Sequence, residues 1–253
     1  YRPSGADDAL PRTRAGALLG LLDRLDTLAG GFGVGLEPSG SRDPFALRRA
    51  GIGVVRLAIA APEIDLRPAV WGAVALFDGA DGPDFSGQAE ELRGRLMGFL
   101  FDRFAGLAER DGARYDEIAA VRPLALGGGP FRPADLSERL AALREFRGSG
   151  DFLALAQASK RVGNILEQAE SRGEPTEPDQ DAAGLALPAE EALREAAREA
   201  EVRAGDCVRS LDYRAALAAI AALRPAVDRF FDDILVMDPD PRLRRARLGL
   251  LAR

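Results

Sequence analysis

The chain has 253 residues, of which 34 are basic and 40 acidic, so its net charge is −6 and any nucleic-acid contact must come from local basic patches. It has no histidine, the commonest general base and metal ligand, and only one cysteine, Cys207. Tetrahedral zinc sites and Ser/His/Asp or Cys/His catalytic triads are therefore excluded, and we predict neither catalytic nor metal-binding residues.

Nearly all of the basic residues are arginine, because Lys160 is the only lysine. A GC-rich coding sequence favours arginine codons and is enough to explain this bias. Guanidinium groups are nevertheless permanently charged planar forks that suit phosphates and base edges. No apolar run approaches the roughly 18 residues of a membrane span, and the first residue is Tyr1 rather than Met. We expect a cytoplasmic piece of a longer protein, without membrane contact.

The first predicted helix covers residues 11–28, where Pro11 suits the first turn and leucines recur at helical spacing. Gly30 and Gly31 are expected to end it, and a glycine-rich loop follows. The stretch Gly31-Phe-Gly-Val-Gly35 does not fit the dinucleotide-binding fingerprint, follows a helix rather than a strand, and precedes no Walker lysine. We interpret it as a tight turn between helices.

The second predicted helix begins at Asp43-Pro44, an N-cap followed by proline in the first turn, and runs to about Ala60. Apolar side chains recur in it every seven residues and would face the core, at Phe45, Ile52 and Ile59. Another face carries a cationic patch formed by Arg49, Gly53 and Arg56, widened by Arg48. A glycine between arginines lets a partner backbone approach closely, which favours binding. The alternative is a solvated face with local ion pairs.

A shorter helix is expected around Pro68–Phe77, and the turn-rich stretch Asp78–Pro83 is the candidate domain boundary. Periodicity and capping predict further helices at 87–110, 115–121, 133–147, 151–168, 188–209, 212–237 with a break at Pro225, and 241–252. The polar, proline-containing stretch 171–187 is predicted to be a flexible linker. No segment alternates convincingly with the period of a strand, so the predicted fold class is all-α.

Two of the later helices carry cationic faces. In 151–168, Phe152, Leu155, Val162 and Leu166 are expected to face the core, and the opposite face consists of Gln157, Lys160, Arg161, Asn164 and Gln168. Such a strip offers phosphate contacts and base-edge hydrogen bonds, although any solvated helix has a polar face. The last helix crowds four arginines together: Arg242, Arg244, Arg245 and Arg247. This is the densest positive patch in the chain, and the alternative is that these side chains are merely solvated.

Several motifs follow one another along the chain. The first half contains Leu10-Pro-Arg-Thr, Asp23-Arg-Leu-Asp-Thr-Leu28, Gly31-Phe-Gly-Val-Gly35 and Asp43-Pro-Phe-Ala-Leu-Arg-Arg49. The second half contains Lys160-Arg-Val-Gly-Asn-Ile165, Asp212-Tyr-Arg-Ala-Ala-Leu217, Leu223-Arg-Pro-Ala-Val-Asp-Arg-Phe-Phe-Asp232 and Arg242-Leu-Arg-Arg-Ala-Arg-Leu248. In order and spacing this set resembles the β subunit of the bacterial two-subunit glycine–tRNA ligase, over nearly the whole chain.

The resemblance implies the carboxy-terminal region of that β subunit. Residues 1–80 would be the end of an HD-like helical domain, and 86–253 a DALR-like anticodon-binding helical bundle. The His–Asp metal pattern of HD phosphohydrolases cannot be present, because the chain has no histidine. In that family the α subunit carries the aminoacylation site, which uses ATP with magnesium, in a heterotetramer of two α and two β subunits. This chain is therefore expected to bind no cofactor itself.

The function that the resemblance implies is binding of the tRNA for glycine, as part of an aminoacyl-tRNA synthetase. The phosphate contacts are expected from Arg48, Arg49, Arg56, Arg242, Arg244, Arg245 and Arg247. The strip that faces the anticodon is expected to be Lys160, Arg161 and Asn164, since unstacked loop bases can be read on their edges. The alternative is a helical subunit-interaction module that chiefly docks the α subunit.

Overall fold

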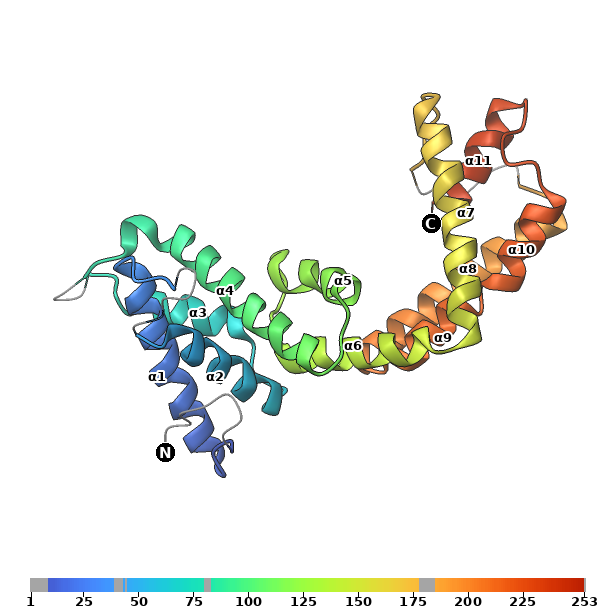
Figure 1. Ribbon diagram of the computed structural model, residues 1–253. Helices are drawn as coiled ribbons and strands as arrows, with labels where there is room; N and C mark the ends of the chain where they lie inside the picture. The colour runs from blue at the N-terminus through green and yellow to red at the C-terminus, as the bar shows by residue number, and fades with distance from the viewer. Residues whose placement is uncertain (1–8, 39–42, 44, 80–82, 178–184, 253) are drawn as a thin grey trace. The chain divides into compact units, whose positions relative to one another are not determined.

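The computed structural model describes residues 9–38, 43, 45–79, 83–177 and 185–252, and all regular structure in these ranges is helical (Figure 1). The predicted all-α fold class is confirmed. The chain forms two compact units, residues 1–141 and 142–253. No helix in the described ranges is long and apolar enough to cross a membrane.

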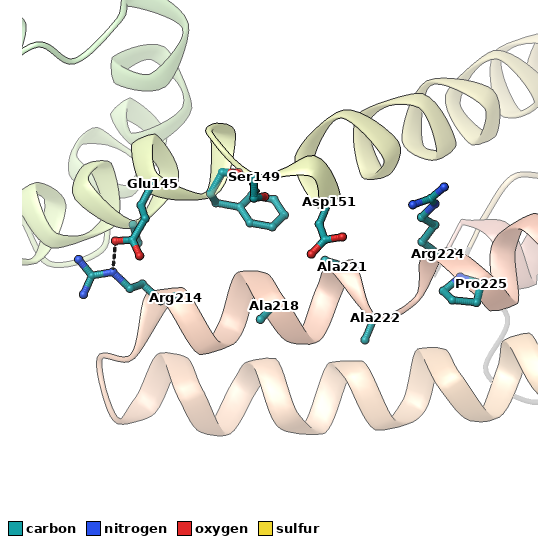
Figure 2. A pocket seen from close by; sticks show the side chains of 11 residues that line it. Glu145, Ser149, Asp151, Arg214, Ala218, Ala221, Ala222, Arg224 and Pro225 are labelled. Carbon is teal, nitrogen blue, oxygen red and sulfur yellow. Dashed lines mark hydrogen bonds and ion pairs between the residues drawn. The ribbon is translucent and has the colours of Figure 1, made fainter.

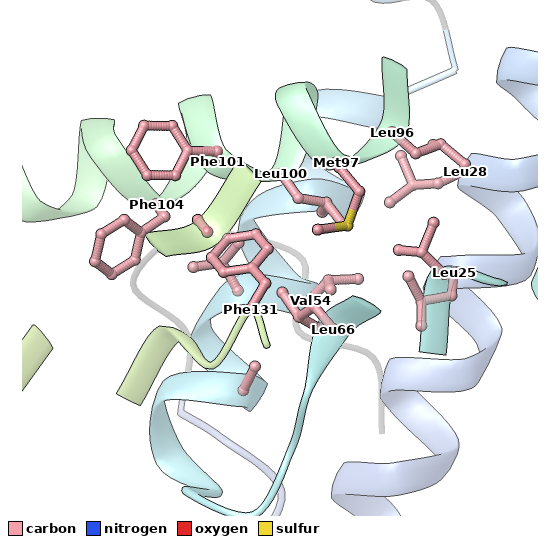
Figure 3. Close-up of a cluster of buried hydrophobic side chains, with 14 of the residues drawn as sticks. Leu25, Leu28, Val54, Leu66, Leu96, Met97, Leu100, Phe101, Phe104 and Phe131 are labelled. Carbon is pink, nitrogen blue, oxygen red and sulfur yellow. The ribbon is translucent and has the colours of Figure 1, made fainter. Parts of the chain in front are cut away.

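The first unit is built around four helices that share one core. Its elements are α1 (Arg14–Gly33), α2 (Leu47–Ala60), α3 (Leu66–Ala75), the short 3₁₀ helix η1 (Ser86–Gln88), α4 (Ala89–Arg110), α5 (Tyr115–Leu126) and the first part of α6 (Pro133–Arg147). Helix α1 packs against α2 and α3, and α4 lies against all three. Figure 3 shows the core between them, where Leu28, Val54, Leu66 and Leu100 are fully buried.

The boundary between the units does not lie at Asp78–Pro83, as we predicted from the turn-rich sequence; of this stretch, 80–82 lie outside the described residues. The described residues on its two sides belong to one core, since Phe77 contacts Phe85 with ring centroids 4.9 Å apart. Leu92 and Leu96 of α4 are buried in that same core. Turn-forming residues mark a change of chain direction, and here the chain turns back onto the core that it has just left.

Helix α1 runs five residues past the predicted end and includes both Gly30 and Gly31. Glycines in this part of α1 allow other side chains to approach the helix backbone closely, and they do not end the helix. A methyl group on Gly31 would lie 3.1 Å from the Leu47 side chain, and one on Gly33 would overlap the Phe85 ring. The helix ends where Gly35 adopts a left-handed conformation with φ 78°.

Helix α2 begins at Leu47, three residues later than predicted, and its N-cap residue is Ala46 rather than Asp43, although the Asp43 side chain still binds the first turn. The Asp43 carboxylate accepts the Leu47 N–H at 2.7 Å and the Arg48 N–H at 3.1 Å. The chain between them passes through Ala46 in a left-handed conformation (φ 55°). Phe45 therefore precedes the helix and is 56% exposed, so its predicted place in the core is wrong. Pro44 lies outside the described residues.

The core face of α2 is also turned relative to the predicted one. Leu47, Val54, Val55, Leu57 and Ala58 are buried, whereas Ile52 and Ile59 are half-buried. The three-residue shift in the start of the helix separates Phe45 from the face that the spacing of seven residues had suggested. Ile59 still packs against the edge of the core.

The second unit contains the end of α6, α7 (Gly150–Ser171), α8 (Pro188–Arg209), α9 (Tyr213–Ala221), α10 (Arg224–Asp233) and α11 (Pro241–Leu251). Helix α8 packs against α9 and α10, and α7 packs against α10 and α11. Helices α6 and α8 have the predicted bounds, and the predicted break near Pro225 is confirmed because α9 ends at Ala221 and α10 begins at Arg224, with Pro225 in its first turn. The predicted linker begins after α7, but its residues 178–184 lie outside the described ranges.

Helix α7 uses a partly different core face from the predicted one. Val162 and Leu166 pack against the core of the second unit together with Ile165, and Ala169 is fully buried. Phe152 lies outside that core, where its ring contacts Phe146 with centroids 5.8 Å apart. The core contacts of α7 are therefore concentrated in its second half.

We predict that Gly33→Ala lowers the free energy of unfolding by about 1–3 kcal/mol, because the added methyl must displace the buried Phe85 ring. Gly94→Ala in α4 is the matched control, since nothing lies within 4 Å of its added methyl, and it should raise the free energy of unfolding by roughly 0.5–1 kcal/mol. Urea denaturation followed by circular dichroism measures both. Equal stability of the two variants would contradict the close packing of Gly33 on Phe85.

Candidate functional site

The cationic patch on α2 is present but less open than the sequence suggested. Arg49 is exposed, whereas Arg48 and Arg56 are half-buried and make interactions within the protein. The surface of Gly53 is occupied by the chain itself, because a methyl group there would lie 2.5 Å from Nε of Arg24 in α1. The prediction that Gly53 admits a partner backbone is therefore wrong: the glycine makes room for a buried arginine of the neighbouring helix.

The strip on α7 is exposed as predicted. Lys160, Arg161 and Asn164 all lie on the solvent side of the helix, with Gln157 and Gln168 above and below them. Arg161 also contacts α10, since its guanidinium carbon lies 4.1 Å from the centroid of the Phe231 ring. Its Nη2 donates to the Phe231 carbonyl oxygen at 3.5 Å. The cationic and amide side chains thus share one face, and one of them rests on an aromatic ring.

Arg247 of α11 is not exposed, contrary to its predicted role as a phosphate contact. Its side chain is 5% exposed and forms ion pairs at 2.7 Å with both Glu190 and Asp238. It also donates to the Leu235 carbonyl oxygen at 2.9 Å. A guanidinium that is buried and bound in this way cannot reach a phosphate without breaking the core, so Arg247 is a structural residue.

Glu190, the buried partner of Arg247, was not recognised from the sequence. It lies in the first turn of α8, and its Oε2 accepts the backbone N–H groups of Ala186 and Leu187, each at 3.0 Å. The residue at the N-cap is Leu187 rather than Ser or Thr, so the usual capping-box pattern is incomplete. The sequence feature that still indicates a helix start here is Pro188 followed by an acidic first turn, which includes Glu190.

Asp238 is the second anion of this network. The Asp240 backbone N–H and the Arg247 guanidinium, both of which donate to the carboxylate, hold the pKa of Asp238 below its ordinary value. Asp238 also offers its carbonyl oxygen to Arg244 at 2.6 Å. The segment before α11 is thereby held by two arginines of that helix.

Of the four arginines on α11, two remain at the surface. Arg244 pairs with Glu174 at 2.7 Å and is half-buried, so it holds the stretch after α7 against α11. Arg242 and Arg245 are exposed. The densest basic stretch of the sequence therefore divides into an inner pair that holds the fold and an outer pair that faces solvent.

A cavity of about 520 Å³ opens in the second unit between the α6–α7 corner and α9–α10 (Figure 2). Its charged lining residues are two acids and two bases, and Glu145 pairs with Arg214 across its edge. Ala218, Ala221 and Ala222 line one wall. Because the charges balance, the cavity has no excess positive charge for a polyanion.

A second cavity of about 520 Å³ is an apolar groove between α1 and α3 of the first unit. Leu22 and Leu76, on its rim, are 59% and 72% exposed. The neighbouring α1 residues Leu18 and Leu19 are exposed as well. Asp23 and Asp26 edge the groove, yet within the described part of the chain no three acidic or cysteine residues gather where they would hold a metal ion.

Comparisons with known proteins match both halves of the chain. The family described as "Glycyl-tRNA synthetase beta subunit" matches residues 1–123, and the family described as "DALR anticodon binding domain" matches residues 155–253, inside the second unit. A "Glycine--tRNA ligase beta subunit" of Leptothrix cholodnii is 43% identical over all of this chain and 33% of its own length. Those of Janthinobacterium and Pseudomonas aeruginosa are each 41% identical over all of this chain, and 34% and 35% of their own length. The chain thus spans about a third of the length of the curated relatives it matches.

We predict that Arg247→Ala destabilises the second unit by about 3–5 kcal/mol, because it leaves the Glu190 carboxylate buried without its counter-charge. Arg245→Ala, two residues away and exposed, is the matched control and should change the free energy of unfolding by less than about 0.5 kcal/mol. Chemical denaturation of the two variants tests this. A similar, small change for both would mean that the ion pairs of Arg247 do not hold the unit together.

Proposed function

The chain belongs to the β-subunit family of glycyl-tRNA synthetases, and from that membership we propose that it is a tRNA-binding part of a glycine–tRNA ligase. It supports the ATP-dependent attachment of glycine to its tRNA, while the α subunit carries the chemistry with ATP and magnesium. The working enzyme is a heterotetramer of two α and two β subunits. The chain itself contributes contacts to the tRNA rather than reacting groups.

The observation that carries this proposal is the coincidence of the anticodon-binding family match with the exposed strip on α7. The strip consists of Lys160, Arg161 and Asn164, which combine cationic and amide side chains on one helix face. A cation neutralises a phosphate, and an amide side chain donates to and accepts from a base edge. In an anticodon loop the bases are unpaired and their edges are accessible, so this combination suits them.

The phosphate contacts belong to the arginines that remain at the surface. Arg49 on α2 and Arg242 and Arg245 on α11 are exposed and have the reach for this role. Arg48 and Arg56 are half-buried and contribute at the edge of the α2 patch. Arg244 and Arg247 are engaged with carboxylates of the protein, so they do not contact phosphates.

We predict that the chain binds the tRNA for glycine more tightly than other tRNAs, with an affinity that falls steeply as salt rises. Arg245→Ala should weaken binding and reduce the slope of log affinity against log salt by about 1, as loss of one phosphate contact does. Asn164→Ala should cost about 1–3 kcal/mol and relax the preference for this tRNA, as loss of a base-edge contact does.

Filter binding at several salt concentrations measures these effects. Arg209→Ala is the control, because Arg209 is an exposed arginine of the second unit that pairs with Asp206 and lies outside the α2 patch, the α7 strip and the exposed pair on α11. Equal affinity for all tRNAs would contradict the proposed function. Unchanged affinity in the Arg48→Ala, Arg49→Ala double variant would remove the α2 patch from the interface.

The apolar groove between α1 and α3 favours a second candidate function, docking of another protein segment. Leu22 and Leu76 are largely exposed on its rim, and an exposed apolar patch rimmed by polar residues is typical of a protein interface. The segment that fits best is a helix with an apolar face and a flanking basic residue, which would pair with Asp26. On this proposal the α subunit supplies that helix.

We predict that the chain and the α subunit elute together from a sizing column without RNA, and that Leu22→Glu with Leu76→Glu abolishes this. A carboxylate on each rim leucine would be desolvated on docking, which is unfavourable. Leu153→Glu, at an exposed leucine of the second unit, is the control and should leave co-elution intact. Co-elution of the groove variant would exclude the groove as the docking surface.

A further inference from the structure

The contact between Arg161 and Phe231 fixes a guanidinium group in the middle of the exposed α7 strip. The guanidinium carbon lies over the ring, 4.1 Å from its centroid, and Nη2 donates to the Phe231 carbonyl oxygen. Arg161 is nevertheless exposed. The guanidinium carbon therefore lies against the ring, while the side chain as a whole remains open to solvent.

The ring beneath the guanidinium is anchored in the core of the second unit. Phe231 is 9% exposed and meets Phe230 edge-on, with ring centroids 5.7 Å apart and planes at 72°. Phe230 is fully buried. Arg161 is carried by α7 and Phe231 by α10, and these two helices pack together. The guanidinium group thus lies against a packed side chain of a helix rather than against a loop.

From this geometry we propose that Arg161 is a stacking platform for one unpaired base of the bound RNA. The proposal rests on the proposed function, because it assigns a mode of contact within that tRNA interface. A flat cation above an aromatic ring, with its far side open, extends the π-stack by one layer, and unpaired bases stack on arginine planes as they do on aromatic rings. Every base has such a face, so this contact supplies affinity with little dependence on sequence.

The same geometry disfavours Arg161 as a phosphate clamp. Bidentate binding of a phosphate uses two parallel N–H groups along one edge of the guanidinium. In Arg161 one N–H of Nη2 donates to the Phe231 carbonyl oxygen, which engages one of the two edges, and the guanidinium carbon is held over the ring. Lys160 and Asn164, one residue before and three after on the same helix, are exposed without this constraint. On this proposal Lys160 contacts a phosphate, Asn164 hydrogen-bonds to a base edge, and Arg161 stacks on the face of a base.

The first test is Arg161→Lys, which keeps the charge and removes the plane. We expect its affinity for the tRNA to fall roughly tenfold, within the range measured for loss of one stacked base. The slope of log affinity against log salt should stay the same, because the number of cationic contacts is unchanged. Arg209→Lys on α8 is the matched control, because Arg209 is an exposed arginine outside the proposed interface, and we expect its affinity to change less than about twofold.

A second test separates stacking from a structural role of the Arg161–Phe231 contact. The wild-type chain and the Arg161→Lys variant are each titrated with a series of tRNA transcripts in which one anticodon-loop nucleotide at a time is abasic. If a base stacks on Arg161, the tenfold difference between the two proteins should shrink to less than about twofold at one loop position and persist at the others.

Two outcomes would overturn the stacking proposal while the proposed function stands: wild-type binding that Arg161→Lys does not weaken, or a loss that is the same for every abasic transcript. The second outcome would show that lysine merely disturbs the packing of α7 on α10. A wild-type chain that shows no preference for this tRNA would instead overturn the proposed function, and the stacking proposal with it.

Discussion

The second unit depends on one buried guanidinium. Arg247 connects the first turn of α8, through Glu190, to the segment before α11, through Asp238 and the Leu235 carbonyl oxygen. Burial of an unpaired charge costs several kcal/mol, so such a network is stable only when every member is paired. Glu190 meets this condition, since one carboxylate oxygen accepts from Arg247 and the other from two backbone N–H groups. The exposed arginines of α11 can face solvent because Arg247 holds the helix in place.

Arginine has two roles in this chain, and the sequence alone does not separate them. Arg67 in α3 donates to the Ala125 and Gly129 carbonyl oxygens, and so satisfies acceptors at the end of α5. Arg24 fills the space above Gly53. In each case the partner that buries the arginine lies on another element. The number of basic residues in a stretch of sequence therefore sets only an upper limit on the number of basic side chains that the fold exposes there.

Local signals in the sequence predicted the helices well and the contacts between them poorly. The bounds of α6 and α8 follow from periodicity and capping within a few residues of each end. The end of α1 does not, because Gly33 is explained by the Phe85 ring, which lies far along the chain. In the same way the exposed α7 strip follows from helical spacing, whereas the burial of Arg247 requires Glu190, 57 residues earlier. The sequence predicted which helix faces carry the cationic side chains of the candidate site. Only the fold shows which of those side chains reach solvent.

Because the net charge of the chain is negative, the Arg161–Phe231 contact matters more for the affinity for RNA. A protein of charge −6 attracts RNA only through local patches, and the inner arginines of α11 are already neutralised by carboxylates. On the proposed function, the salt-dependent part of the binding free energy comes from the arginines that remain at the surface. Contacts that do not rely on net charge supply the part of the affinity that salt does not screen. A base stacked on a guanidinium held above a buried ring is such a contact, because desolvation and dispersion act there at any ionic strength.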